Sequence, residues 1–140
     1  MADPRNAVNN IARYRAQTYA HDATIVYDET EAGGSAQVGL AVTQEGSETV
    51  SLVGDGEQVE GKLIKVESDG FCVVQIEGEM TLPGGTSATL TEGTPIVGDL
   101  LVSAEGYIRS AASATAADLL VARGTIVDSS TATAVVVRLP

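Results

Sequence analysis

The sequence predicts an all-β protein, a small antiparallel β-barrel or β-sandwich with an extended N-terminal arm. Its apolar runs are short and recur at roughly ten-residue spacing, with no long helical pattern between them. Fifteen glycines and many serines and threonines interrupt these runs, which favours strands joined by tight turns. Only 4% of the residues are aromatic and Trp is absent, so aliphatic side chains must fill the core. A chain of 140 residues has the usual size of one domain.

Short β-prone runs follow one another along the chain. The pair Asp69-Gly70 lies between two of these runs and is the strongest hairpin signal, because Asp-Gly fits the turns that join antiparallel strands. The last two runs are expected to form a closing hairpin across residues 128–131. The expected strands are residues 23–27, 37–43, 49–53, 62–67, 71–77, 79–82, 87–91, 96–103, 106–110, 119–127 and 133–139.

Residues 116–123 leave an alternative open. Their alanines and leucines favour a helix, whereas the flanking β-prone residues favour a strand over residues 119–127. We expect the strand, preceded by a loop over the small residues 111–117.

Residues 1–20 differ from the rest of the chain in charge. They hold three arginines against one acid, a net charge of +2, whereas residues 21–140 hold five bases against 18 acids, a net charge of −13. We therefore predict an N-terminal arm over residues 1–20, ordered by a partner, and a β-rich body over residues 21–140. The alternatives are a locally packed tail, with a short helix over residues 11–19, or a disordered one. The predicted partner-binding residues of the arm are Arg5, Ile11, Arg13, Tyr14, Arg15 and Tyr19.

Charge and hydropathy exclude two classes of partner. The pI is about 4.2, and an acidic body repels phosphate backbones, so we expect no nucleic-acid binding. No apolar run approaches the roughly 20 residues that span a bilayer, so we expect no membrane insertion. The N-terminus lacks the apolar segment of a secretory signal, which predicts synthesis in the cytoplasm.

The residues that carry chemistry are few and isolated. His21 is the single histidine and is expected to be an exposed linker residue, a poor general base. Cys72 is the single cysteine and is expected to lie buried in a strand, on one face with Val74 and Ile76. The acids of residues 28–31 lack the spacing of a calcium loop. We predict no catalytic residues, no cofactor and no metal.

Four segments together resemble the small capsid decoration (cement) proteins of tailed bacteriophages. They are residues 10–14 (NIARY), 59–66 (VEGKLIKV), 69–78 (DGFCVVQIEG) and 98–109 (GDLLVSAEGYIR). The resemblance covers most of the chain and consists of strand order and glycine placement. It implies a structural virion protein on the outer capsid surface that binds the major capsid protein and stabilises the assembled shell. It also implies a homotrimer at three-fold or quasi-three-fold positions.

Two other classes remain as alternatives. A carbohydrate- or receptor-binding β module needs an exposed aromatic platform, for which the body offers Tyr27, Phe71 and Tyr107. A small β-barrel enzyme or a biotinyl-type or lipoyl-type carrier ranks last, because neither Lys62 nor Lys65 is expected at a hairpin tip.

Overall fold

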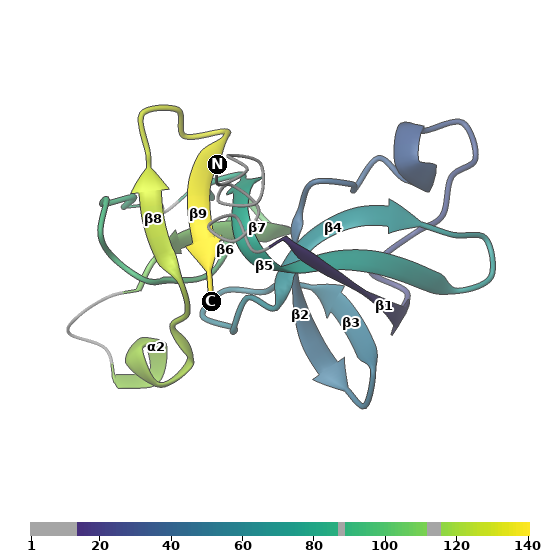
Figure 1. Cartoon of the computed structure of the whole chain (residues 1–140), viewed down its shortest axis with the longest axis horizontal. Helices are drawn as coiled ribbons and strands as arrows, with labels where there is room; N and C mark the ends of the chain where they lie inside the picture. Colours follow the sequence, from purple (N-terminus) through teal and green to yellow (C-terminus); the bar gives the residue numbers. More distant parts are fainter. Residues whose placement is uncertain (1–13, 87–88, 112–115) are drawn as a thin grey trace, which may run out of the picture.

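The computed structural model describes residues 14–86, 89–111 and 116–140, and it confirms the all-β fold class (Figure 1). Strand makes up 49% of the chain and helix 7%, and five of the strands close a barrel. The elements in chain order are β1 (Arg15–His21), the 3-10 helix η1 (Ala32–Gly34), β2 (Ala41–Gly46), β3 (Thr49–Leu52), β4 (Gly61–Val66), β5 (Phe71–Leu82), β6 (Ile96–Leu101), β7 (Ala104–Ser110), α2 (Ala116–Val121), β8 (Thr125–Asp128) and β9 (Val135–Leu139).

The barrel consists of β1, β3, β2, β4 and β5 in that order, and the pairing of β1 with β5 closes it. The β1–β3 pair is parallel and the other pairs are antiparallel. Closure leaves no open edge among these strands, which suits a soluble β-protein. The barrel core is aliphatic apart from one Tyr and one Cys, as the composition requires. It contains Tyr19, Ile25, Val42, Val50, Leu52, Leu63, Val66, Cys72, Val74 and Ile76.

Strand β5 belongs to two parts of the molecule because it bends at Gly78. The strand is 12 residues long; its first half pairs with β1 and β4, and its second half, from Gly78, pairs with β9. Gly78 has a φ of 96°, a conformation that side chains with a Cβ rarely adopt. The expected runs 71–77 and 79–82 are therefore one strand with a glycine bend rather than two strands.

The remaining strands surround a second core. Strands β5, β9 and β8 continue the sheet, and β6 and β7 form a hairpin. Ile96 and Arg123 exchange backbone hydrogen bonds of 3.0 and 3.1 Å, which join β6 to the chain before β8. The Ile108 amide donates to the Pro83 carbonyl at 3.0 Å, which joins β7 to the chain after β5. The second core contains Ala41, Val53, Val59, Met80, Leu82, Ile96, Ile108, Ile126, Val135, Val137 and Leu139.

The structure corrects the boundary between arm and body. Residues 15–21 form β1, one of the barrel strands, so residues 15–20 are not an arm. The alternative expectation of a helix over residues 11–19 is wrong for residues 15–19. Alternation explains the strand: Tyr19 points into the core and Thr18 is exposed. Residues 1–13 lie outside the described residues.

Four expected strands also differ from the structure. In the expected strand 37–43, residues 37–40 lie outside any strand and β2 begins at Ala41. Residues 23–27 form a loop, in which the Asp22 carboxylate accepts a hydrogen bond of 2.9 Å from the Thr24 amide and so favours a turn. Residues 89–91 are irregular, and residues 87–88 lie outside the described part of the chain. Residues 116–121 form α2, so the helix alternative is correct there. The closing hairpin is confirmed: it is formed by β8 and β9, and β8 begins at Thr125.

Candidate protein-binding surface

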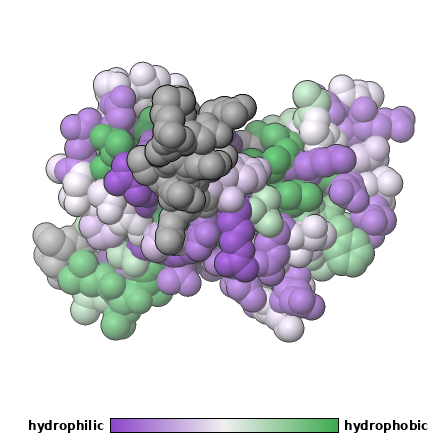
Figure 2. All heavy atoms as spheres, viewed as in Figure 1, coloured by the Kyte–Doolittle hydropathy of each residue, from purple (hydrophilic) through white to green (hydrophobic). Residues whose placement is uncertain are grey.

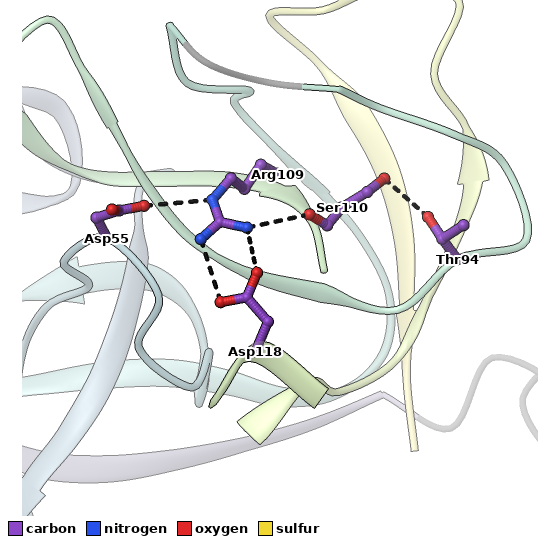
Figure 3. Close-up of polar contacts among 5 residues, drawn as sticks. All are labelled: Asp55, Thr94, Arg109, Ser110 and Asp118. Carbon is purple, nitrogen blue, oxygen red and sulfur yellow. Dashed lines mark hydrogen bonds and ion pairs between the residues drawn. The ribbon is translucent and has the colours of Figure 1, made fainter. Parts of the chain in front are cut away.

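A buried ion pair fixes α2 against β7. The guanidinium of Arg109 donates two hydrogen bonds to the Asp118 carboxylate, from Nη1 to Oδ2 at 2.6 Å and from Nη2 to Oδ1 at 3.2 Å (Figure 3). Nη1 also donates to the Ser110 carbonyl at 3.3 Å, and Nε donates to Asp55 Oδ1 at 3.2 Å. One arginine of β7 therefore holds the first turn of α2 and the turn that contains Asp55.

Burial makes this pair stronger than a surface ion pair. The side chains of Arg109 and Asp118 are 18% and 7% exposed, whereas Asp55 is 60% exposed. The hydrogen bonds to Asp118 raise the pKa of the Arg109 guanidinium, with a smaller contribution from Asp55. A bidentate geometry between an arginine and a carboxylate adds orientation as well as energy. The pair therefore fixes the position of α2, while Asp55 adds little.

Helix α2 presents two leucines to solvent. Leu119 is 53% exposed and Leu120 is 84% exposed. Figure 2 shows a hydrophobic patch at the lower left, the position of α2 in Figure 1. A helix of six residues is too short to be stable in isolation, so tertiary contacts such as the Arg109–Asp118 pair must hold it in place. Fixed, exposed leucines are typical of a contact surface for another protein.

An acidic turn lies beside the ion pair that holds α2. The turn of residues 54–57 packs against the ion pair: a Cβ added at Gly56 would lie 3.7 Å from Asp118 Oδ1. Two reciprocal hydrogen bonds, Gly56 amide to Gly98 carbonyl at 2.9 Å and Gly98 amide to Glu57 carbonyl at 2.8 Å, fix this turn on β6. The carboxylates of Glu57 and Glu105 both approach Gly54. We call this surface the α2 corner; its residues are Leu119, Leu120 and, across the ion pair, Asp55.

The structure separates the residues predicted for the arm. Tyr19 is 4% exposed, and its hydroxyl donates a 2.7 Å hydrogen bond to Glu60 Oε2, so it is a core residue and not a partner contact. Burial and the Glu60 hydrogen bond raise the pKa of Tyr19 to about 12. Tyr14 is 62% exposed, and Arg15 is exposed opposite Glu77 at the start of β1. Predicted residues Arg5, Ile11 and Arg13 lie outside the described residues.

Sequence reasoning missed the α2 corner. It predicted a strand over residues 119–127. Because successive side chains of a strand point to opposite faces, Leu119 and Leu120 would not have been together on the surface. The available signal was Asp118 followed by two leucines within an alanine-rich segment, which is the pattern of a short helix with an acid in its first turn. The partner of Asp118, Arg109, is nine residues earlier and has no sequence signature.

The two isolated reactive residues have structural positions. Cys72 is buried, and burial raises its thiol pKa to about 11, which disfavours the nucleophilic thiolate. His21 was expected to be an exposed linker residue, but it ends β1 and is only partly exposed. Its Nδ1 lies 3.0 Å from the Asp22 carbonyl, and its buried Nε2 has no hydrogen-bond partner within the described part of the chain. Among the described residues, no group of three or more His, Cys, Asp or Glu side chains is arranged to hold a metal ion.

A shallow pocket lies beside η1 at the other end of the molecule. It has a volume of about 460 Å³, and its wall includes Tyr27, which is 41% exposed. Acidic side chains and one lysine complete its polar lining. The lining residues are Tyr27, Glu29, Glu31, Gly33, Gly34, Lys65, Val66, Glu67 and Ser68.

No protein-family model, no curated protein and no solved structure matches this chain. In the described residues, no helix has the length and apolar character needed to cross a membrane.

Proposed function

We propose that this protein is a non-enzymatic capsid decoration (cement) protein of a tailed bacteriophage. It is made in the host cytoplasm, binds the major capsid protein on the outside of the assembled shell and stabilises that shell. It acts as a homotrimer at three-fold or quasi-three-fold positions. The phage assignment rests on the resemblance of residues 10–14, 59–66, 69–78 and 98–109 to that group.

The observation that carries the proposal is the α2 corner. A buried bidentate ion pair holds a six-residue helix in place, and this helix carries a leucine, Leu120, that is 84% exposed. Leu119 and Leu120 are adjacent and do not belong to either hydrophobic core, so together they form an apolar surface patch rather than a scattered exposed residue. Binding to another protein accounts for it.

Stabilisation of a shell follows from selective binding. A protein that binds only the assembled lattice shifts the equilibrium toward assembly by mass action. A trimer presents each contact three times, so weak individual contacts combine through their effective concentration. Exposed Tyr14 and Arg15, together with Arg5, Ile11 and Arg13 of the preceding segment, supply a second contact. The acidic body keeps the protein away from packaged nucleic acid.

Co-sedimentation tests the proposal. Purified protein is mixed with intact shells that lack decoration, and in parallel with unassembled capsid subunits. We expect saturable co-sedimentation with shells, no complex with subunits and a higher temperature of shell disruption. A variant lacking residues 1–13 is the correct truncation, because removing residues 1–20 would delete most of β1 and open the barrel. Absence of binding to every intact shell offered contradicts the proposal.

A second candidate function is sugar binding at the η1 pocket. An exposed tyrosine beside carboxylates combines a stacking surface with hydrogen-bond acceptors, which suits a carbohydrate ring. A glycan array distinguishes the two functions. Binding of a defined glycan that Tyr27→Ala abolishes, with no binding to shells, favours the carbohydrate- or receptor-binding module.

A further inference from the structure

Arg123 lies between α2 and β8 and contacts two parts of the molecule at once. Its backbone exchanges hydrogen bonds of 3.0 and 3.1 Å with Ile96 of β6. The next residue, Gly124, is packed so closely on β9 that an added Cβ would lie 2.7 Å from the Arg138 carbonyl oxygen. The main chain at this point therefore belongs to the part of the molecule around the second core, whereas the side chain of Arg123 reaches the barrel.

The guanidinium of Arg123 binds three backbone carbonyls. Nη1 donates to the Val59 carbonyl at 3.1 Å and to the Glu60 carbonyl at 2.7 Å, just before β4 begins. Nη2 donates to the Ile76 carbonyl at 3.2 Å, within the barrel half of β5. Because the donor is charged, these hydrogen bonds are stronger than bonds between neutral groups. One side chain thus joins the segment before β4 to β5.

Ile76 lies at an irregularity of β5. The register of the β1–β5 pair shifts between Arg15 and Ala16 and leaves Ile76 without a partner in β1. A residue passed over in this way forms a β-bulge, and the ladder is disrupted there. The Arg123 guanidinium supplies a partner for the Ile76 carbonyl. It therefore acts where β5 leaves the barrel toward β9, two residues before the bend at Gly78.

A carboxylate connects this site to β1. Glu60 Oε1 lies 3.8 Å from Arg123 Nη1, and Glu60 Oε2 accepts the 2.7 Å hydrogen bond from the Tyr19 hydroxyl. The side chains of Arg123 and Glu60 are both largely buried, so water and salt screen their attraction only in part. Tyr19 belongs to the barrel core. A continuous set of contacts therefore runs from β1 through Glu60 and Arg123 to the chain that follows α2.

The exposed leucines lie between two arginine contacts. Asp118, in the first turn of α2, is held by Arg109 of β7. Arg123 follows the end of α2 by two positions. A helix of six residues depends on tertiary contacts for its order. Leu119 and Leu120 are therefore flanked by an anchor on β7 and an anchor on the barrel.

We infer that Arg123 is a positioning residue of the α2 corner, because it fixes the leucine-bearing helix relative to the barrel. Only the consequence for binding rests on the proposed function. When α2 is fixed in this way, the α2 corner and the exposed Tyr14 and Arg15 beside the start of β1 have a constant separation. A partner then contacts both without first ordering the protein, which strengthens two-site binding.

Substitution of Arg123 in the full chain tests the anchor. Arg123→Met keeps an unbranched apolar stem and removes every donor. Arg123→Lys keeps the charge but loses the planar fork that binds carbonyls of two segments. The matched control is Arg138→Met, which removes an exposed arginine whose ion pair with Glu79 lies within the β5–β9 pairing.

Hydrogen exchange of the backbone amides measures the order of α2. In Arg123→Met we expect the α2 amides to exchange about tenfold faster, through a local opening whose rate does not depend on low concentrations of urea. Arg123→Lys should give an intermediate rate, and Arg138→Met should leave the α2 amides unchanged. A merely structural role would accelerate only the amides of the β2–β3 ladder, through global unfolding. That result in folded Arg123→Met overturns the inference; if Arg123→Met does not fold, the same result in Arg123→Lys overturns it.

Co-sedimentation with intact shells gives the second measurement. We expect folded Arg123→Met to bind about tenfold more weakly than the natural sequence, and Arg123→Lys to recover part of that loss. Undiminished binding by an Arg123→Met protein with a loosened α2 overturns the positioning role and leaves the decoration role intact. If the natural sequence binds no shell, the decoration role is contradicted, and the exchange rates of α2 still decide whether Arg123 is its anchor.

Discussion

Arg109 and Asp118 join β7 to α2 through a two-pronged ion pair, with N–O distances of 2.6 and 3.2 Å, in a nearly buried setting. The pair is only nine residues apart in sequence, and it fixes the orientation of a helix too short to hold itself. The pair therefore connects the stability of the part of the molecule around the second core to the exposed position of Leu119 and Leu120.

Replacing Asp118 should destabilise the protein. In Asp118→Ala, the partly buried guanidinium of Arg109 loses its main partner, and we expect a loss of about 3 kcal/mol in the free energy of unfolding, measured in urea. The matched control is Asp55→Ala, which removes the exposed partner of the same arginine and should cost less than about 1 kcal/mol. Equal losses in the two variants would show that burial does not distinguish these contacts.

The hydroxyl of Tyr19 should titrate far above an ordinary tyrosine. Its folded pKa is raised to about 12 from 10.0, mainly by burial and then by the hydrogen bond to Glu60. Because the folded pKa is the higher one, this stabilisation is complete below pH 10 and is lost as the pH rises from about 10 to 12. Phenolate absorbance should therefore show one tyrosine ionising late, and Tyr19→Phe should remove that late step. A late step that persists in Tyr19→Phe contradicts the assignment.

The fold class was predictable from local patterns, and the arm boundary was not. Gly placement and alternation located β4, β5 and β9 because those strands are half buried and their turns are tight. The strand of residues 15–21 was harder to predict. Arg15, Gln17 and His21 are on the same face as the buried Tyr19, and their polar side chains obscure the apolar alternation of a half-buried strand. Only pairing with the distant strands β3 and β5 makes this segment a strand, and local sequence carries no record of that pairing.

The candidate surface was less predictable than the fold. Whether Leu119 and Leu120 enter a core or remain exposed depends on the tertiary contact of Asp118 with Arg109 of β7. Such surfaces arise from tertiary contacts, so sequence reasoning instead favoured the one charge contrast visible along the chain, the basic N-terminus.

Gly78 should resist substitution because of its backbone conformation. At a φ of 96°, Gly78→Ala places a Cβ in a disfavoured region within β5, and we expect a loss of about 1–2 kcal/mol in the free energy of unfolding. Gly46→Ala is the control: Gly46 has no positive φ, and an added Cβ meets nothing within 4 Å. We expect its unfolding midpoint to stay near that of the natural sequence. A neutral Gly78→Ala would argue against the glycine bend.

Cys72 should be inert in the folded protein. Its thiol is buried in the barrel core, and burial raises its pKa to about 11, so little thiolate exists at neutral pH. A chromogenic disulfide reagent should label it only as fast as the barrel opens, and labelling should accelerate through the urea unfolding transition. Rapid labelling under native conditions would contradict the buried position.

Leu120 should matter for binding and not for folding. Its side chain is 84% exposed and lies outside both cores, so Leu120→Ser should change the free energy of unfolding by less than about 0.5 kcal/mol. If the α2 corner is a contact surface, the same change should weaken binding to shells or to a second copy by about tenfold, because a central apolar contact is lost. Exposed Val26, at 58%, is the matched control, since it is an aliphatic residue outside the α2 corner. Val26→Ser should leave both kinds of binding unchanged; equal effects of the two variants would remove the α2 corner from the proposed function.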